Sequence, residues 1–168
     1  SASWSPDGER IAVTFGGMSA LLKNSDGSGA DTSLGGHLSP VRAVAWSPDG
    51  RRVLTAADDA TARVWSVDGA NVGAALKGHK LHILSAAWSP DGRRIVTASV
   101  DHTARVWDVD GGGDPGVLTG HTALVTSARW SPDGKRVVTA SNDGTARIWT
   151  VDFAENLRYV RAATTDCL

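Results

Sequence analysis

The chain has 168 residues, of which 41% are hydrophobic and 21% are charged, the balance of a globular protein with a core of its own. Its net charge of −1 excludes broad electrostatic binding to nucleic acid or to an anionic membrane, since both require a clustered basic field. The one cysteine excludes an intrachain disulfide and no apolar run reaches the length of a membrane span, so we expect a cytoplasmic protein.

The sequence repeats itself every 42 residues. The string Trp-Ser-Pro-Asp-Gly begins at Trp4, Trp46, Trp88 and Trp130. A second string, Thr-Ala-Arg-(Val or Ile)-Trp, begins at Thr61, Thr103 and Thr145, and a Gly-His pair ends at His37, His79 and His121. Because three independent strings keep one period without an insertion, we divide the chain into four units and a tail: residues 1–35, 36–77, 78–119, 120–161 and 162–168.

The first unit departs from the others. It has Val13, Gly17 and Lys23 where the second unit has Thr, Asp and Trp, and no Gly-His pair precedes it. Terminal repeats are often atypical in this way.

Because only three residues precede Trp4, we expect a fragment of a larger multidomain protein. The excess of Arg over Lys and the many Ala, Gly, Val and Asp residues are typical of a GC-rich bacterial genome.

Each complete unit has the pattern of four short antiparallel strands, as the third unit illustrates. Residues 83–88 are small and apolar, and a Ser-Pro-Asp-Gly turn then leads into a return strand over 94–99. A second tight turn precedes a strand over 103–109 with alternating faces, and a glycine-rich connector leads to a short strand over 116–119. Since no segment has a helical period of useful length, the sequence predicts an all-β fold.

The Gly-His pairs, the Ser-Pro-Asp-Gly turns and the Asp-x-Thr-Ala-Arg-(Val or Ile)-Trp strings resemble the WD-repeat family over residues 1–153. The Trp-Asp pair itself occurs once, at Trp107-Asp108. The resemblance implies a β-propeller of four WD-type blades, each with four antiparallel strands. Four such blades leave two apolar end faces, so we expect a partial ring: half of a larger ring, or a module that closes an eight-bladed ring with a second copy.

The end of the chain breaks the repeat. We expect residues 157–160 to supply the outer strand of the fourth blade. The run over 161–168 resembles the end of the WD-repeat region in large bacterial signalling proteins, including serine/threonine kinases and signalling NTPases. None of the kinase or nucleotide-binding motifs occurs in this chain.

The last three units each combine a His, a hydroxyl, an Asp and a Trp: His37, Thr55, Asp59 and Trp65; His79, Thr97, Asp101 and Trp107; His121, Thr139, Asp143 and Trp149. Hydroxyl, His and Asp together are also the pattern of nucleophilic catalysis. The family resemblance implies instead a buried hydrogen-bond relay, and an active site does not need three equivalent copies. We therefore expect a structural relay and no enzyme activity.

Two further sets of residues resemble parts of a site. His82 and His102 fall in loops on the same side of the third blade, but no Cys or carboxylate cluster completes a metal site there, so we expect neither a metal nor another cofactor. Arg63, Arg105 and Arg147 recur at one position, and we expect their stems beside the Trp of the same strand with their heads paired or solvated.

The loops with the Gly-His pairs and the Asp-x-Thr turns are expected to share one face of the blades, which we call the rim. Their framework is constant while the residues between vary, so specificity for a protein or peptide partner is expected there. The candidate partner-binding residues are Leu38, Asp58, Lys80, Leu81, His82, Val100, His102, Thr122, Leu124 and Asn142.

A protein-interaction scaffold is the function that this pattern favours. Three alternatives stay open: a propeller-based enzyme, a spacer between domains, and the C-terminal regulatory or sensor region of a kinase or signalling NTPase whose catalytic domain lies outside this chain.

Overall fold

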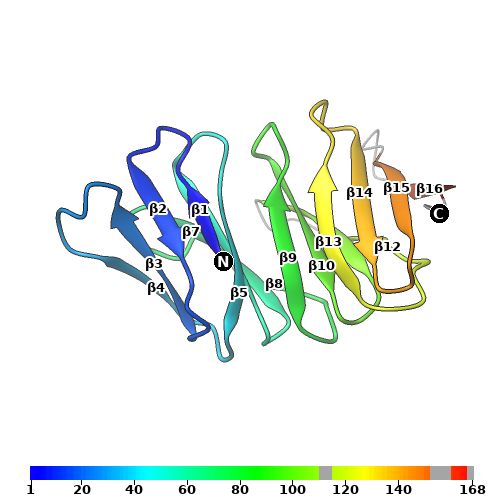
Figure 1. Ribbon diagram of the computed structural model, residues 1–168, viewed down its shortest axis with the longest axis horizontal. Helices are drawn as coiled ribbons and strands as arrows, with labels where there is room; N and C mark the ends of the chain where they lie inside the picture. Colours follow the sequence, from blue (N-terminus) through cyan, green and yellow to red (C-terminus); the bar gives the residue numbers. More distant parts are fainter. Residues whose placement is uncertain (110–114, 152–159, 166–168) are drawn as a thin grey trace.

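The computed structural model describes residues 1–109 and 115–151, together with the backbone of 160–165. Within these residues the chain forms sixteen β-strands and no helix. The strands make four separate four-stranded sheets, one for each repeat (Figure 1). The described part of the chain therefore has no helical segment that could cross a membrane.

Every sheet is an antiparallel meander in which consecutive strands are neighbours. The first sheet contains β1 (Ala2–Trp4), β2 (Arg10–Val13), β3 (Ser19–Asn24) and β4 (Thr32–Gly35). The second contains β5 (Val41–Trp46), β6 (Arg52–Ala57), β7 (Thr61–Ser66) and β8 (Leu76–Lys77). The third contains β9 (Ile83–Trp88), β10 (Arg94–Ser99), β11 (Ala104–Asp108) and β12 (Gly116–Leu118). The fourth contains β13 (Val125–Trp130), β14 (Arg136–Ser141), β15 (Ala146–Val151) and β16 (Val160–Thr165).

The Ser-Pro-Asp-Gly turn reverses the chain between the first two strands of each sheet. In the third sheet, Ser89 Oγ donates to Asp91 Oδ1 at 2.5 Å, and the Gly92 amide donates to the Ser89 carbonyl at 2.9 Å. Gly92 has a φ of 66°, a conformation that costs glycine little and other residues more. The turn is therefore held by its own side chains, which explains why it recurs unchanged in every unit.

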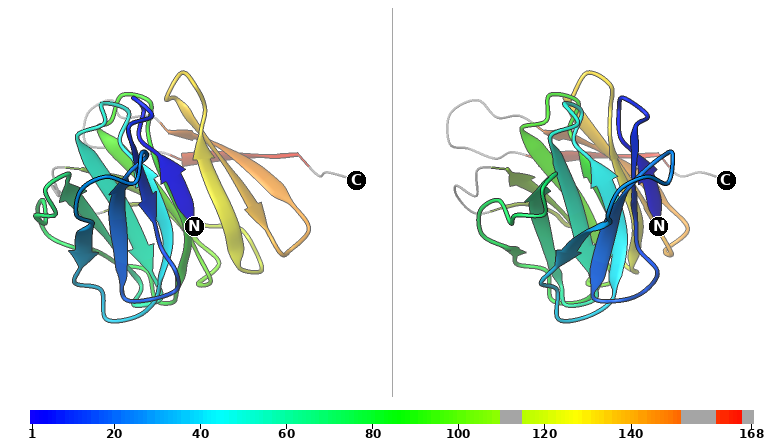
Figure 2. Two further views of the ribbon diagram at one scale, coloured as in Figure 1. Left: turned by 60° about the vertical axis from the view of Figure 1, so that its left-hand side comes forward. Right: turned by 90° about the vertical axis from the view of Figure 1, so that its left-hand side faces the viewer.

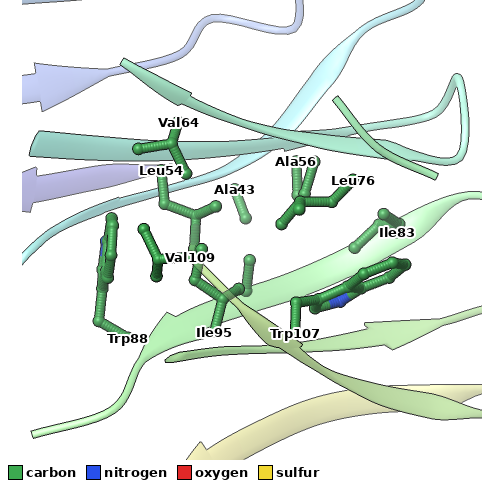
Figure 3. Close-up of a cluster of buried hydrophobic side chains, with 12 residues drawn as sticks. Ala43, Leu54, Ala56, Val64, Leu76, Ile83, Trp88, Ile95, Trp107 and Val109 are labelled. Carbon is green, nitrogen blue, oxygen red and sulfur yellow. The ribbon is translucent and has the colours of Figure 1, made fainter. Parts of the chain in front are cut away.

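The sheets pack face to face in an open row, with the first strands side by side in the order β1, β5, β9, β13 (Figures 1 and 2). Between the second and third sheets, Leu54, Val64 and Leu76 lie opposite Ile95 and Trp107 (Figure 3). Full burial of one such aliphatic side chain stabilises the fold by about 2 kcal/mol. Since a single sheet cannot cover its own apolar face, each blade depends on its neighbours.

The outer strand of the fourth sheet differs from the expectation. β16 pairs with β15 from Val151 opposite Val160 to Ala146 opposite Thr165, so it starts where the expected strand ends and continues into the expected tail. Residues 157–159 lie outside the described residues. Neither the repeat nor a turn motif marks this last connection, so a short apolar pattern could not set the register.

Candidate functional site

The relay of the third blade is a continuous chain of hydrogen bonds between four side chains. Trp107 Nε1 donates to Thr97 Oγ1 at 2.9 Å, and Thr97 Oγ1 lies 2.8 Å from His79 Nε2. His79 Nδ1 lies 2.8 Å from Asp101 Oδ2. Asp101 in turn accepts the amide and the hydroxyl of Thr103 at 3.0 and 2.6 Å. The chain joins β11, β10, the loop before β9 and the β10–β11 turn.

The direction of each proton in the relay follows from the charge states. Burial lowers the pKa of His79, so the ring is neutral near pH 7. Burial raises the pKa of Asp101, but hydrogen bonds from Thr103, the Lys80 amide and His79 outweigh that effect and lower it to about 2. The ionised Asp101 therefore accepts from His79 Nδ1–H. His79 Nε2 then accepts from the Thr97 hydroxyl, which accepts from Trp107.

The second and fourth blades repeat this geometry. The His Nδ1 to Asp distance is 3.0 Å in the second blade and 2.7 Å in the fourth. The His Nε2 to Thr distances are 2.8 and 2.7 Å, and both Trp Nε1 to Thr distances are 2.8 Å. The first blade has no relay; there Thr14 Oγ1 donates to the Val41 carbonyl of the next blade at 2.8 Å.

The relay cannot act as a nucleophilic triad, because its hydroxyls are closed to solvent. Thr55 and Thr97 are completely buried, and Thr139 is 1% exposed. A nucleophile must approach its substrate to within about 3.5 Å. The relay therefore ties strands and turns together, and it positions the loops of the rim.

The glycine of each Gly-His pair leaves space for the repeated arginine. A Cβ on Gly78 would lie 2.8 Å from Arg105 Nη1 and 3.2 Å from the Trp107 ring. The Nε atoms of Arg63, Arg105 and Arg147 are buried and have no hydrogen-bond partner among the described residues. The expectation that these heads are paired or solvated is therefore wrong for Nε, because each guanidinium lies buried beside the glycine of a Gly-His pair.

The rim loops of the second, third and fourth blades are joined by main-chain hydrogen bonds. The Val100 amide donates to the His82 carbonyl at 3.0 Å, and the Asn142 amide donates to the Leu124 carbonyl at 3.0 Å. The corresponding bond in the second blade joins the Asp58 amide to the Pro40 carbonyl at 2.9 Å. This face lies at the bottom of Figure 1, opposite the Ser-Pro-Asp-Gly turns. The relay and these bonds together give the rim a constant backbone frame.

The candidate partner-binding residues differ in how far they reach into solvent. Leu38 is 80% exposed and Leu81 is 47% exposed. Val100 and Leu124 are half-buried. The other exposed members are Lys80, His82, His102, Thr122 and Asn142.

Asp58 is the exception in the candidate set, because its side chain is only 10% exposed. Arg42 Nε and Nη2 donate to its carboxylate at 2.6 to 2.9 Å. His82 Nδ1 donates to its carbonyl oxygen at 2.7 Å and so links the second and third blades. The hydrogen bond from Arg42 lowers the pKa of Asp58. The sequence did not reveal this cluster, since positions 42, 58 and 82 carry other residues in the neighbouring units.

His82 and His102, the two histidines on the same side of the third blade, do not lie in a metal site within the described residues. The His82 ring is hydrogen-bonded to the main-chain carbonyl of Asp58. His102 is exposed and has a φ of 68°. Within the described residues, no group of three or more His, Cys, Asp or Glu side chains is placed to hold a metal ion.

A groove of about 510 Å³ runs along the first strands β1, β5, β9 and β13. Tryptophan, proline and alanine side chains line most of it. Of the described residues at its wall, Arg129 has the one charged side chain, and its Nη1 donates to Ser85 Oγ at 2.7 Å and to the Ala128 carbonyl at 2.8 Å. The groove brings together no pair of acid and base groups.

Four-stranded meanders that pack face to face, three of them with a Trp-Thr-His-Asp relay, define a β-propeller repeat protein. The family model described as "WD domain, G-beta repeat" matches residues 30–66, 71–108 and 114–150, so the chain belongs to the WD-repeat family. Modules of this family generally mediate protein–protein interactions and generally lack catalytic activity. The search of curated proteins found no match to the chain.

Proposed function

We propose that this chain is a protein-interaction scaffold that binds a protein or peptide partner through its rim. The observation that supports the proposal most is a constant frame with changing side chains. Leu38, Lys80 and Thr122 occupy one position after the relay histidine, and the amide of each donates to a relay aspartate at 2.9 to 3.1 Å. Their side chains are all exposed and differ in chemistry, which is how a scaffold acquires specificity.

A second candidate interaction concerns the end faces of the row. Trp4 is 64% exposed, whereas Trp46 and Trp88 at the same position are 7% and 8% exposed. Trp46 Nε1 donates to the Ser3 carbonyl of the preceding blade at 3.2 Å. At the other end Val138 is 43% exposed, while the equivalent Leu54 is fully buried. These faces favour a further blade on each side, from a larger ring or from a second copy that closes an eight-bladed ring.

The wider setting of the module is proposed on the sequence alone. We infer that the chain is a fragment of a larger, bacterial, cytoplasmic protein with a role in signalling. We propose neither nucleic acid nor a membrane as its partner. A kinase or signalling NTPase with this region as its C-terminal sensor is the alternative, as is a propeller-based enzyme or a spacer between domains.

Affinity capture with paired variants tests the rim proposal. The wild-type chain and a variant of the opposite face, Arg51→Ser/Arg93→Ser, should retain the same partner. The rim variant Leu38→Ser/Leu81→Ser should lose it. A partner that is retained by the rim variant but lost by the opposite-face variant would overturn the proposal.

A further inference from the structure

We propose that the rim of the first three blades binds a segment of the partner that combines apolar side chains with carboxylates. The surface consists of Met18, Leu38, Arg42, Lys80, Leu81 and His82, and we call it the rim patch. This inference rests on the proposed function and adds the chemistry of the partner.

Hydrogen bonds between blades join the segments that carry the rim patch. The Val41 amide donates to the Gly17 carbonyl at 2.8 Å and so joins the start of β5 to the turn that carries Met18. His82 Nδ1 donates to the Asp58 carbonyl at 2.7 Å and so joins the loop before β9 to the β6–β7 turn. Side chains from three blades are therefore held on one face.

The apolar part of the rim patch is unusually open. Leu38 is the most exposed of the large hydrophobic side chains in the described residues, and Met18 and Leu81 are also exposed. Isolated exposed leucines are common on protein surfaces, but here three apolar side chains share one rim. Covering them would give a partner a hydrophobic contribution that the opposite face, with Arg51, Arg93 and Lys135 at its turns, does not offer.

The charged groups that a partner can reach on the rim patch are cationic. The rim carboxylates of Asp58, Asp59 and Asp101 are 6% to 10% exposed, and each already accepts hydrogen bonds from this chain. In contrast, the side chains of Arg42 and Lys80 are open to solvent.

Arg42 retains capacity for a second carboxylate. Its Nε and Nη2 are used by Asp58, while its Nη1 makes no hydrogen bond within the described residues. A guanidinium has five N–H donors in a planar fork, so a carboxylate of the partner can bind Nη1 without displacing Asp58. Charge-assisted hydrogen bonds of this kind favour an acidic segment over a neutral one.

The fourth blade shows that the frame does not impose this chemistry. It has the same relay and the same amide-to-carbonyl bond, yet Thr122, Thr126 and Asn142 stand at the positions of Leu38, Arg42 and Asp58. The rim patch is therefore a property of the first three blades, and the rim of the fourth blade supplies a matched control.

Selection from a displayed random-peptide library tests the proposal with the whole 168-residue chain as bait. The enriched peptides should combine Asp or Glu with large apolar residues. Their affinity, measured by calorimetry, should fall about tenfold with Lys80→Glu and with Leu38→Ser/Leu81→Ser, and it should weaken as salt is added. The fourth-blade variant Thr122→Ala/Asn142→Ala should bind as the wild type does. All these positions are exposed, and a circular dichroism melt of each variant verifies its fold.

The outcomes separate the chemistry from the function. Enriched peptides that are basic, or that depend on Thr122 and Asn142 instead, would overturn the rim patch but leave rim binding intact. Peptides that bind all rim variants equally, or a library without any enrichment, would contradict both.

Discussion

Oδ2 of Asp101 lies 2.8 Å from Nδ1 of His79, although the turn that carries Asp101 and the loop that carries His79 are 22 residues apart. The same carboxylate oxygen accepts the Lys80 amide at 3.0 Å. One side chain therefore holds both the relay and the backbone of a rim loop. Stability and rim geometry should respond together when this contact is changed.

Removal of the indole donor should lower stability without a large cavity. Trp107→Phe loses the hydrogen bond to the buried Thr97 hydroxyl, so we expect the free energy of unfolding to fall by about 1 to 3 kcal/mol, which includes the stranded partner and the smaller ring. Urea unfolding measures the difference. Trp4→Phe is the control, since Trp4 is largely exposed, and it should change little. Equal losses in the two variants would argue against the relay.

Acid should destabilise the chain partly through Asp101. Its pKa is lowered from 3.8 to about 2 on folding, so its contribution is complete above about pH 4 and is lost as the pH falls toward 2. By linkage that contribution is about 2 kcal/mol. Asp101→Asn should be less stable at neutral pH and should show a shallower loss of unfolding free energy between about pH 4 and 2. Identical acid slopes in variant and wild type would exclude this role.

The β10–β11 turn should become more stable with glycine. His102 has a φ of 68°, while Gly144 occupies the same position in the fourth blade with a φ of 81°. A residue with a side chain is strained in the left-handed conformation, and this strain energy exceeds the entropy that glycine loses on folding. The free energy of unfolding of His102→Gly should therefore rise by about 0.5 kcal/mol. The reciprocal Gly144→Ala should lose about 1 kcal/mol. Thermal unfolding gives both values, and a destabilised His102→Gly would show that the imidazole makes a contact of its own.

The exposed end faces should be visible in the oligomeric state. If a second copy closes the ring, light scattering of the 168-residue chain should give twice the mass of one chain. Trp4→Ser or Val138→Lys should then shift the equilibrium toward the single chain, because each change removes apolar area from an end face. A wild-type chain that stays monomeric at high concentration would rule out the second copy.

Much of this structure could be predicted, because its main determinants repeat. The Ser-Pro-Asp-Gly turn, which occurs four times, and the alternation in Thr103, Arg105 and Trp107, which occurs three times, each depend on local chemistry, and the repeated copies make each assignment less ambiguous than one copy would. The 42-residue spacing also indicated which His, Thr, Asp and Trp belong to one blade. The spacing does not give the distances between these side chains, which come from the structure.

What could not be predicted depends on residues that occur once. The pairing of Arg42 with Asp58, and of Asp58 with His82, joins residues that are replaced by other types at the equivalent positions of the other units. The register of β16 likewise had neither a repeat nor a turn to mark it. A period identifies what the copies share, whereas specific binding depends on how they differ.

Hydrogen exchange of the chain with and without its captured partner tests rim binding most directly. The account predicts that the partner slows amide exchange in residues 36–40 and 78–82, the loops before β5 and β9, more than in the turns over 47–50 and 89–92. Protection confined to those turns, with the rim loops unchanged, would contradict it.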